Sequence, residues 1–162
     1  MPSSPLSMES GQPNALYYKR SHFVTRLPLE HLYSPSHYWL AQQQPGTWRI
    51  GLTQFATRML GEIVDYGFEI QPAAPLQIGQ VVGWIEGFKA VSDVFSVLDG
   101  RFSIINPDLG KEPDAIDRDC YGQGWLYEAS GTPDHLCVDV QGYKNLLDAT
   151  IDKLVENQHS AE

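Results

Sequence analysis

The sequence predicts a mainly β fold, a flattened barrel or sandwich with short helices and a helix near the C-terminus. Three observations lead to this prediction. Short segments rich in β-branched and aromatic residues recur along the chain, turns rich in Gly and Pro separate them, and one amphipathic stretch stands near the end. The 162 residues suffice for one domain with a hydrophobic core and are too few for two domains of ordinary size.

The N-terminal part of the chain is expected to begin with a flexible tail. Residues 1–15 are rich in Ser, Pro, Gly and Asn and carry no recognisable chemistry. A single domain is then expected over residues 16–162. Its first strand is expected at 22–25, a short β-prone run that ends before Pro28.

The remaining strands are expected as short extended runs: 37–42, 47–51, 62–66, 81–86, 90–97, 100–105 and 125–130. The first two flank a Pro45-Gly46 turn, which favours a hairpin. Thr53 can cap a short helix that Gly61 ends. The segments 71–79 and 106–124 are rich in turn residues, so we expect connectors there.

One helix is expected at residues 142–158. Apolar and small residues recur there at helical spacing, which places them on one stripe with the charged residues opposite. The stripe consists of Tyr143, Leu146, Leu147, Thr150, Ile151, Leu154 and Val155. We expect this helix to pack on the edge of the sheet.

Composition and charge exclude several classes of function. The formal net charge of −9 repels phosphate groups, so we expect no nucleic-acid partner and no membrane partner, and we expect protein partners with basic faces. The chain has no apolar run of membrane-spanning length, and its first residues do not form a secretory signal. A cytoplasmic protein is therefore expected. Cys120 and Cys137 do not form a disulfide pattern, and both are expected as free thiols.

Motifs for metal binding and for nucleophilic catalysis are not found in the sequence. The five histidines lack paired ligand spacing, so we expect no metal site. There is no G-x-S-x-G elbow, and we assign no catalytic residue. His37 and Trp39 are expected to have structural roles.

The segment WIEGFKAVSDVF, residues 84–95, places Lys89 at the tip of an expected hairpin. Most lysines at such positions are simply solvated turn residues. Here Glu86 and Asp93 flank the lysine, and Gly87 permits a tight backbone. An amine presented outward on a stiff base suits a ligase that acylates one lysine, and it suits a carrier that delivers a tethered group to other proteins.

Several motifs in order along the chain resemble those of the H protein of the glycine cleavage system. EGFKAVSD, residues 86–93, resembles the family's lipoyl-attachment segment E-S-V-K-A-x-S-D, with the modified lysine at Lys89. The other matching motifs are YSPSHYW at 33–39, IGLTQFATRMLGEIV at 50–64 and YGQGWL at 121–126. The resemblance spans roughly residues 33–157.

The resemblance implies a carrier and not an enzyme. The family's fold is a flattened barrel and sandwich hybrid of the lipoyl/biotinyl carrier type, in agreement with the prediction from strand and turn patterns. It implies covalent lipoate on Lys89, attached by a lipoate ligase or lipoyl transferase. Glu86 and Asp93 correspond to flanking recognition residues, and Ser36 and Tyr38 to residues of the cleft that shelters the arm. The arm would carry intermediates between partner enzymes.

The departures from the family pattern bear on the pathway. Tyr38 stands where the family has an acid that contacts the ammonium of the aminomethyl group, and such a charge-assisted contact is commonly worth about 1.5–3 kcal/mol. Gly87-Phe88 replaces Ser-Val before the lysine, and residues 17–28 have no counterpart in ordinary H proteins. We therefore favour an H-like lipoate-binding protein of bacterial sulfur oxidation, with a heterodisulfide-reductase-like complex as partner.

Two alternatives remain open from the sequence. In the first, the protein is a glycine cleavage H protein that works with the glycine cleavage enzymes. In the second, it is a non-catalytic lipoyl-relay or partner-binding module. The chain retains Glu86, Lys89 and Asp93 together, which argues against a degenerate H-like domain that has lost the attachment site.

Overall fold

Two antiparallel sheets packed face to face form the body of the molecule. The computed structural model describes residues 14–161, and the expected tail falls outside that range except for Asn14 and Ala15. The larger sheet has the order β3 (Leu32–Tyr33), β4 (Tyr38–Gln44), β5 (Thr47–Leu52), β11 (Tyr127–Pro133), β10 (Leu98–Ile105) and β7 (Pro75–Leu76). The smaller sheet has the order β6 (Ile63–Phe68), β8 (Val81–Gly87) and β9 (Val91–Phe95).

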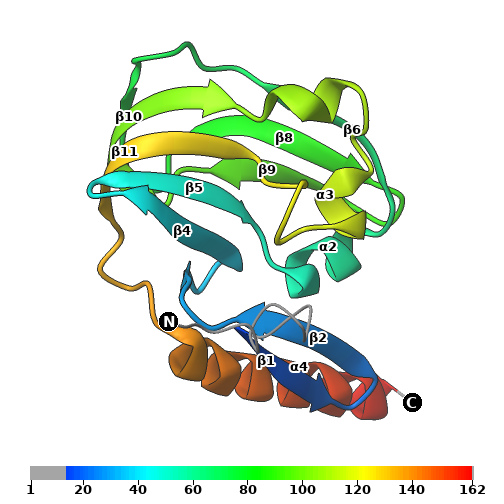
Figure 1. The fold of residues 1–162 in the computed structure, drawn as a ribbon. Helices are drawn as coiled ribbons and strands as arrows, with labels where there is room; N and C mark the ends of the chain where they lie inside the picture. The colour runs from blue at the N-terminus through cyan, green and yellow to red at the C-terminus, as the bar shows by residue number, and fades with distance from the viewer. Residues whose placement is uncertain (1–13, 162) are drawn as a thin grey trace, which may run out of the picture.

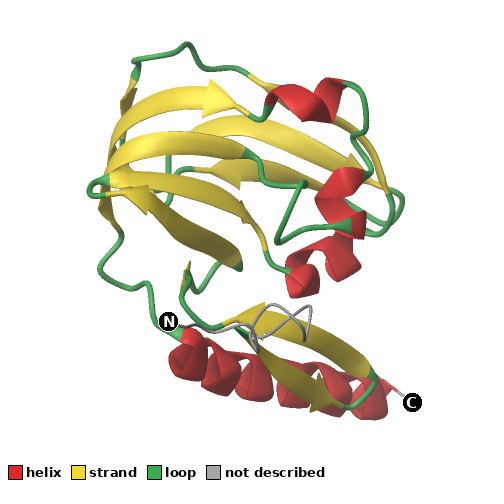
Figure 2. Cartoon of the chain, viewed as in Figure 1, coloured by secondary structure: helices red, strands yellow, loops and turns green. Residues whose placement is uncertain are grey.

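The main core lies between these two sheets. Alternate residues of each strand point inward, as the period of a β-strand requires. Buried side chains of the larger sheet meet those of the smaller one, among them Leu40, Ile50, Leu98, Phe102, Val82, Ile85 and Val94. The predicted fold class, mainly β with short helices and a C-terminal helix, is confirmed (Figure 2).

The short helices lie around the sheets. Helix α2 (Gln54–Leu60) follows β5; Thr53 accepts a hydrogen bond from the Ala56 amide at its start, and Gly61 ends it, as predicted. The predicted connector at 106–124 contains a 3₁₀ turn, η1 (Pro107–Gly110), and a one-turn helix, α3 (Ala115–Arg118). No helix within residues 14–161 has the length and apolarity needed to cross a membrane.

A hairpin and the C-terminal helix form a third layer, seen below the sheets in Figure 1. The hairpin consists of β1 (Ala15–Arg20) and β2 (Phe23–Pro28), and it packs on α4 (Val140–Ala161). A second core lies within and around this layer. Its buried members are Tyr18, Phe23, Leu27, Tyr33, Trp39, Phe55, Val140, Tyr143, Leu147 and Ile151.

The prediction for the N-terminal region was partly wrong. It placed one strand at 22–25, whereas the structure has two, and the predicted tail extends to Ala15, which begins β1. The turn between the strands contains Ser21 at φ 56° and lacks the Gly or Asn that signals such a turn in a sequence. The helix α4 contacts the edge strand β3, as predicted, but it also packs on the hairpin, which was not predicted.

Candidate functional site

The turn between β8 and β9 presents Lys89 at the edge of the molecule. Lys89 is exposed, and the Gly87 amide donates to the Ala90 carbonyl across the turn at 2.8 Å. Two further backbone hydrogen bonds hold the turn from outside the hairpin. The Phe88 amide donates to the Glu62 carbonyl, and the Lys89 amide donates to the Leu60 carbonyl, each at 2.8 Å. The lysine backbone is therefore fixed while its side chain remains accessible.

Two glycines permit this close approach of backbones. A Cβ on Gly87 would collide with the carbonyl oxygen of Leu60. Gly61 has a φ of 81°, and a Cβ there would lie 2.9 Å from Cγ of Lys89. The Gly87 that the sequence analysis noted for a tight turn is thus needed for contact with the end of α2.

The flanking acids of the sequence motif lie on the hairpin strands. Glu86 pairs with Val91, and Asp93 pairs with Trp84, so both carboxylates project from the same face of the hairpin. Both residues are exposed. Approaching proteins can therefore contact both acids together with the lysine.

A cleft of about 340 Å³ begins beside the lysine and runs along the free edge of β9. It brings together Ser36 and Tyr38, which were predicted to line the cleft of the arm, and Asp93, which was predicted as a flanking recognition residue. Glu86 is not among its lining residues. The lining consists of Ser36, His37, Tyr38, Leu52, Phe55, Ala56, Met59, Leu60, Ile85 and residues 90–95. Most of these side chains are apolar, so the cleft suits an aliphatic chain.

On the other side of α2 lies a second, polar recess of about 310 Å³, which Lys89 itself lines. Glu62 and Asp117 contribute carboxylates to it, and Arg58 and Gly61 come from the end of α2. This recess was not predicted from the sequence, because α3 and α2 meet there from distant parts of the chain. Helix α2 therefore separates two spaces at the base of Lys89.

Tyr38 has a structural contact that the sequence analysis missed. It is 3% exposed, and its hydroxyl oxygen accepts a hydrogen bond from the Phe95 amide at 2.9 Å. Burial raises the pKa of Tyr38 to about 12, and the nearby negative charge of Asp93 acts in the same direction. The neutral phenol therefore joins the larger sheet to the end of β9, besides lining the cleft.

His37 and Trp39 are structural, as predicted. Nδ1 of His37 lies 2.8 Å from the Tyr143 hydroxyl, which in turn lies 2.7 Å from Oγ1 of Thr53. Burial lowers the pKa of His37 to about 4, so its ring is neutral at physiological pH. The Trp39 indole is buried and donates to the Cys120 carbonyl at 2.9 Å.

Comparison with known proteins agrees with this geometry. The family model described as "Glycine cleavage H-protein" matches residues 31–151. This chain belongs to that family. A glycine cleavage system H protein from Coxiella burnetii (strain Dugway 5J108-111) is 32% identical over 131 residues, covering 78% of this chain and 98% of that protein. One from Mycobacterium leprae (strain Br4923) is 34% identical over 105 residues, covering 65% of this chain and 79% of that protein.

A solved structure is similar as well. The crystal structure of a glycine cleavage system H protein from Mycobacterium marinum aligns with a TM-score of 0.66 and 27% identity, covering 74% of this chain and 97% of that chain. Members of the H-protein family carry covalent lipoate and have a carrier role. The names of these relatives support the glycine cleavage alternative better than the sulfur-oxidation interpretation that the sequence analysis favoured.

Proposed function

We propose that this protein is a lipoyl carrier with lipoate amide-linked to Nζ of Lys89, and that it serves glycine cleavage. The observation that carries the proposal is the combination of an exposed lysine on a doubly anchored turn with an apolar cleft that begins at the next residue, Ala90. The fixed backbone lets a ligase recognise one lysine, and the exposed side chain lets it be acylated.

The residues around Lys89 fit the lipoyl group. Apolar side chains of α2 and β9, such as Phe55, Met59 and Val91, can cover its aliphatic chain and dithiolane ring and exclude water. Gly61 keeps the base of the arm free of steric obstruction, and Gly87 lets the Lys89 turn approach the Leu60 carbonyl. When attached, lipoate supplies a disulfide and dithiol pair that takes up and hands on the carried group.

The proposed partners are the glycine cleavage enzymes and a lipoate ligase or lipoyl transferase. Glu86 and Asp93 are the proposed recognition residues beside the lysine, and Ser36, Tyr38 and Asp93 are proposed to line the resting place of the arm. The net charge of −9 favours encounter with basic docking faces. The cytoplasm is the proposed compartment, since Cys120 and Cys137 are free thiols.

A second candidate is the sulfur-oxidation carrier with a heterodisulfide-reductase-like partner. Asp93 is the one carboxylate among the described residues of the cleft, and the Tyr38 hydroxyl is already engaged by the Phe95 amide. A cleft of this kind accommodates an uncharged sulfur cargo at least as well as an ammonium group, which needs a charged partner when it is buried.

The attachment site is tested by lipoylation in vitro. The purified protein is incubated with lipoate, ATP and a lipoate ligase, and the adduct is located by mass spectrometry. We expect one adduct, lost in Lys89→Ala and kept in the matched control Lys111→Ala. An adduct that persists in Lys89→Ala would refute the assignment.

The pathway is tested on the lipoylated protein. Incubation with glycine and a glycine decarboxylase is expected to load an aminomethyl group on the arm, detected as a mass increase of the peptide that contains Lys89. If the arm does not load with glycine but takes up sulfur from a sulfane-sulfur donor, the second candidate replaces the first.

A further inference from the structure

The β1–β2 hairpin lies outside the family match, which begins at residue 31. It nevertheless packs against the helix that separates the two spaces at the base of Lys89. This raises the question of what the hairpin does for the arm.

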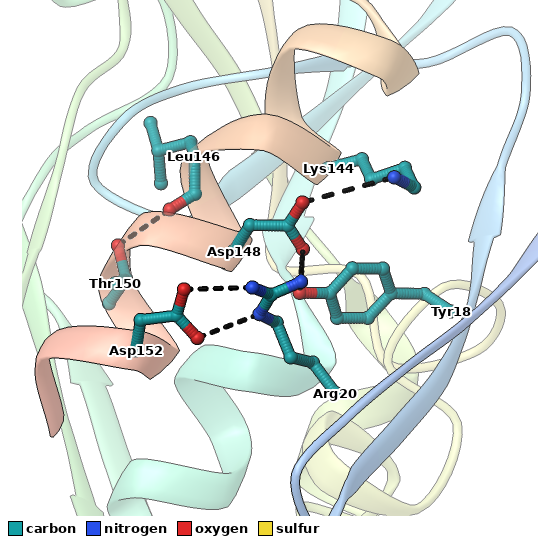
Figure 3. Close-up of polar contacts among 7 residues, drawn as sticks. All are labelled: Tyr18, Arg20, Lys144, Leu146, Asp148, Thr150 and Asp152. Atoms are coloured by element: carbon teal, nitrogen blue, oxygen red, sulfur yellow. Dashed lines mark hydrogen bonds and ion pairs between the residues drawn. The ribbon is translucent and has the colours of Figure 1, made fainter. Parts of the chain in front are cut away.

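The hairpin is held on α4 by a polar cluster at its tip (Figure 3). Nε and Nη2 of Arg20 each donate to the Asp152 carboxylate at 2.8 Å, and Nη1 lies 3.3 Å from Asp148. The Tyr18 hydroxyl donates to the same Asp148 carboxylate at 2.8 Å. The rings of Tyr18 and Phe23 are buried in the second core, beside this polar cluster. Hairpin and helix therefore form one packed unit.

This unit contacts α2 through the inner face of β2. The ring of Phe23 meets the ring of Phe55 edge-on, with 5.6 Å between centroids and an interplanar angle of 85°. Oγ1 of Thr25 donates to Oε1 of Gln54 at 2.6 Å, at the first residue of α2. The guanidinium of Arg58, near the end of α2, lies 5.7 Å from the centre of the Phe23 ring. Contacts from β2 thus reach both ends of α2.

Helix α4 supplies a further contact to the same region. The Tyr143 hydroxyl lies 2.7 Å from Oγ1 of Thr53, the residue that caps α2, and 2.8 Å from Nδ1 of His37, which lines the cleft. One phenol on α4 therefore ties the start of α2 to His37, another lining residue of the cleft.

The other end of α2 holds Lys89. The Leu60 carbonyl accepts the Lys89 amide at 2.8 Å, and Phe55, Met59 and Leu60 line the cleft. An α-helix of 7 residues is too short to be stable alone, so tertiary contacts decide its position. Any contact that holds α2 also holds the Lys89 turn.

We propose that Phe23, Thr25 and Tyr143 are positioning residues for the arm. Through them, the hairpin and α4 hold α2 against the sheets, and α2 holds the backbone of Lys89 and one wall of the cleft. The part of this inference that concerns the lipoyl arm rests on the proposed lipoyl function. The positioning of the Lys89 turn does not depend on it.

The first test compares Phe23→Ala with Val24→Ala by amide hydrogen exchange of the full chain. Val24 is the next residue, faces outward and is 38% exposed, so its variant changes the hairpin without touching α2. In Phe23→Ala we expect exchange at the Lys89 amide to become at least about tenfold faster, because a buried aromatic contact to α2 is lost. Exchange at Phe102, whose amide donates to the Ala74 carbonyl at 2.9 Å, reports global unfolding. It should stay unchanged in Val24→Ala, and in Phe23→Ala it should remain slower than exchange at Lys89, which opens locally.

A second variant covers the case in which Phe23→Ala does not fold. Thr25→Val keeps the shape of the side chain and removes the hydrogen bond to Gln54, so faster exchange is expected across α2 and at Lys89. Unchanged exchange at Lys89 in a folded Phe23→Ala protein, or in Thr25→Val if the first variant is unfolded, would overturn the inference.

The arm itself is tested with lipoylated, reduced protein. Alkylation of the arm thiols, followed on the peptide that contains Lys89, is expected to be several-fold faster in Phe23→Ala than in wild type and Val24→Ala, because the cleft wall is displaced. Equal alkylation rates would refute the role in sheltering the arm. Absence of any adduct on Lys89 in wild type would instead refute the proposed function and leave the exchange result standing.

Discussion

At the scale of single residues, Tyr38 shows how one position serves two purposes. From the sequence, Tyr38 was related only to the cargo, since it replaces an acid of the family motif. In the structure its hydroxyl accepts the Phe95 amide at the end of β9, 57 positions away in the chain. Tyr38 therefore contributes to the packing of the two sheets as well as to the polarity of the cleft.

Replacement of Tyr38 by Phe is expected to lower the free energy of unfolding by about 1–3 kcal/mol, because the Phe95 amide loses its buried acceptor. Tyr38→Glu should cost more, since a carboxylate would occupy a buried site. Urea unfolding measures both losses. Tyr66→Phe is the matched control: no hydrogen bond of the Tyr66 hydroxyl is found within residues 14–161, and a change below about 0.5 kcal/mol is expected. Equal losses in Tyr38→Phe and Tyr66→Phe would contradict the role of the Tyr38 hydroxyl.

Gly87→Ala tests the contact between the Lys89 turn and α2. The added Cβ meets the Leu60 carbonyl oxygen, so the turn must move away from α2. Lipoylation by a ligase is expected to slow several-fold, measured as initial rate by mass spectrometry. Gly110→Ala is the control, because a Cβ there has open space. An unchanged rate in Gly87→Ala would show that the ligase tolerates a displaced turn.

At the scale of elements, apolar and polar contacts contribute differently to the layer of hairpin and α4. Phe23 is buried between the hairpin and α2, whereas the Arg20 side chain is 42% exposed where it pairs with Asp148 and Asp152. Exposed ion pairs are screened by water and salt, while buried apolar contacts are not. Apolar packing should therefore dominate the stability of this layer.

Phe23→Ala is accordingly expected to lower the free energy of unfolding by about 3–5 kcal/mol. Arg20→Met should cause a smaller loss, and that loss should shrink as salt is added. Denaturant unfolding at low and high ionic strength separates the two effects. A loss in Arg20→Met that equals that of Phe23→Ala and is independent of salt would contradict this ranking.

At the scale of the whole molecule, two half-buried histidines link stability to pH. Burial lowers the pKa of both His31 and His37 to about 4. In the unfolded chain each imidazole has a pKa of about 6.5. Between these values the unfolded state binds more protons than the folded state, so stability is full above the unfolded pKa and falls as pH decreases.

We therefore expect the free energy of unfolding to decrease between pH 6.5 and 5, by at most about 1.4 kcal/mol per pH unit for each histidine. Unfolding measured across this range should show a smaller slope in His31→Gln. The control is His135→Gln, because the His135 side chain is 90% exposed. A slope that does not change in His31→Gln would show that other groups cause the pH dependence.

The features predicted from the sequence are those that residues close together in the chain mark clearly. The Lys89 hairpin was predicted because strand, turn and flanking acids all lie within 84–95. Helix α2 was predicted because Thr53 and Gly61 mark its two ends. The β1–β2 hairpin was missed because its turn lacks the residues that usually mark one, although Ser21 adopts a positive φ.

The sequence by itself determined the mainly β class, the position of Lys89 at a hairpin tip and the helical stripe of α4, because each depends on residues close together in the chain. Only the tertiary structure decided where the cleft lies, what Tyr38 contacts and which elements hold the turn. Those features join Phe23 to Phe55, Tyr38 to Phe95 and Leu60 to Lys89. Such contacts are set by how the sheets and helices pack, and local propensity carries no information about them.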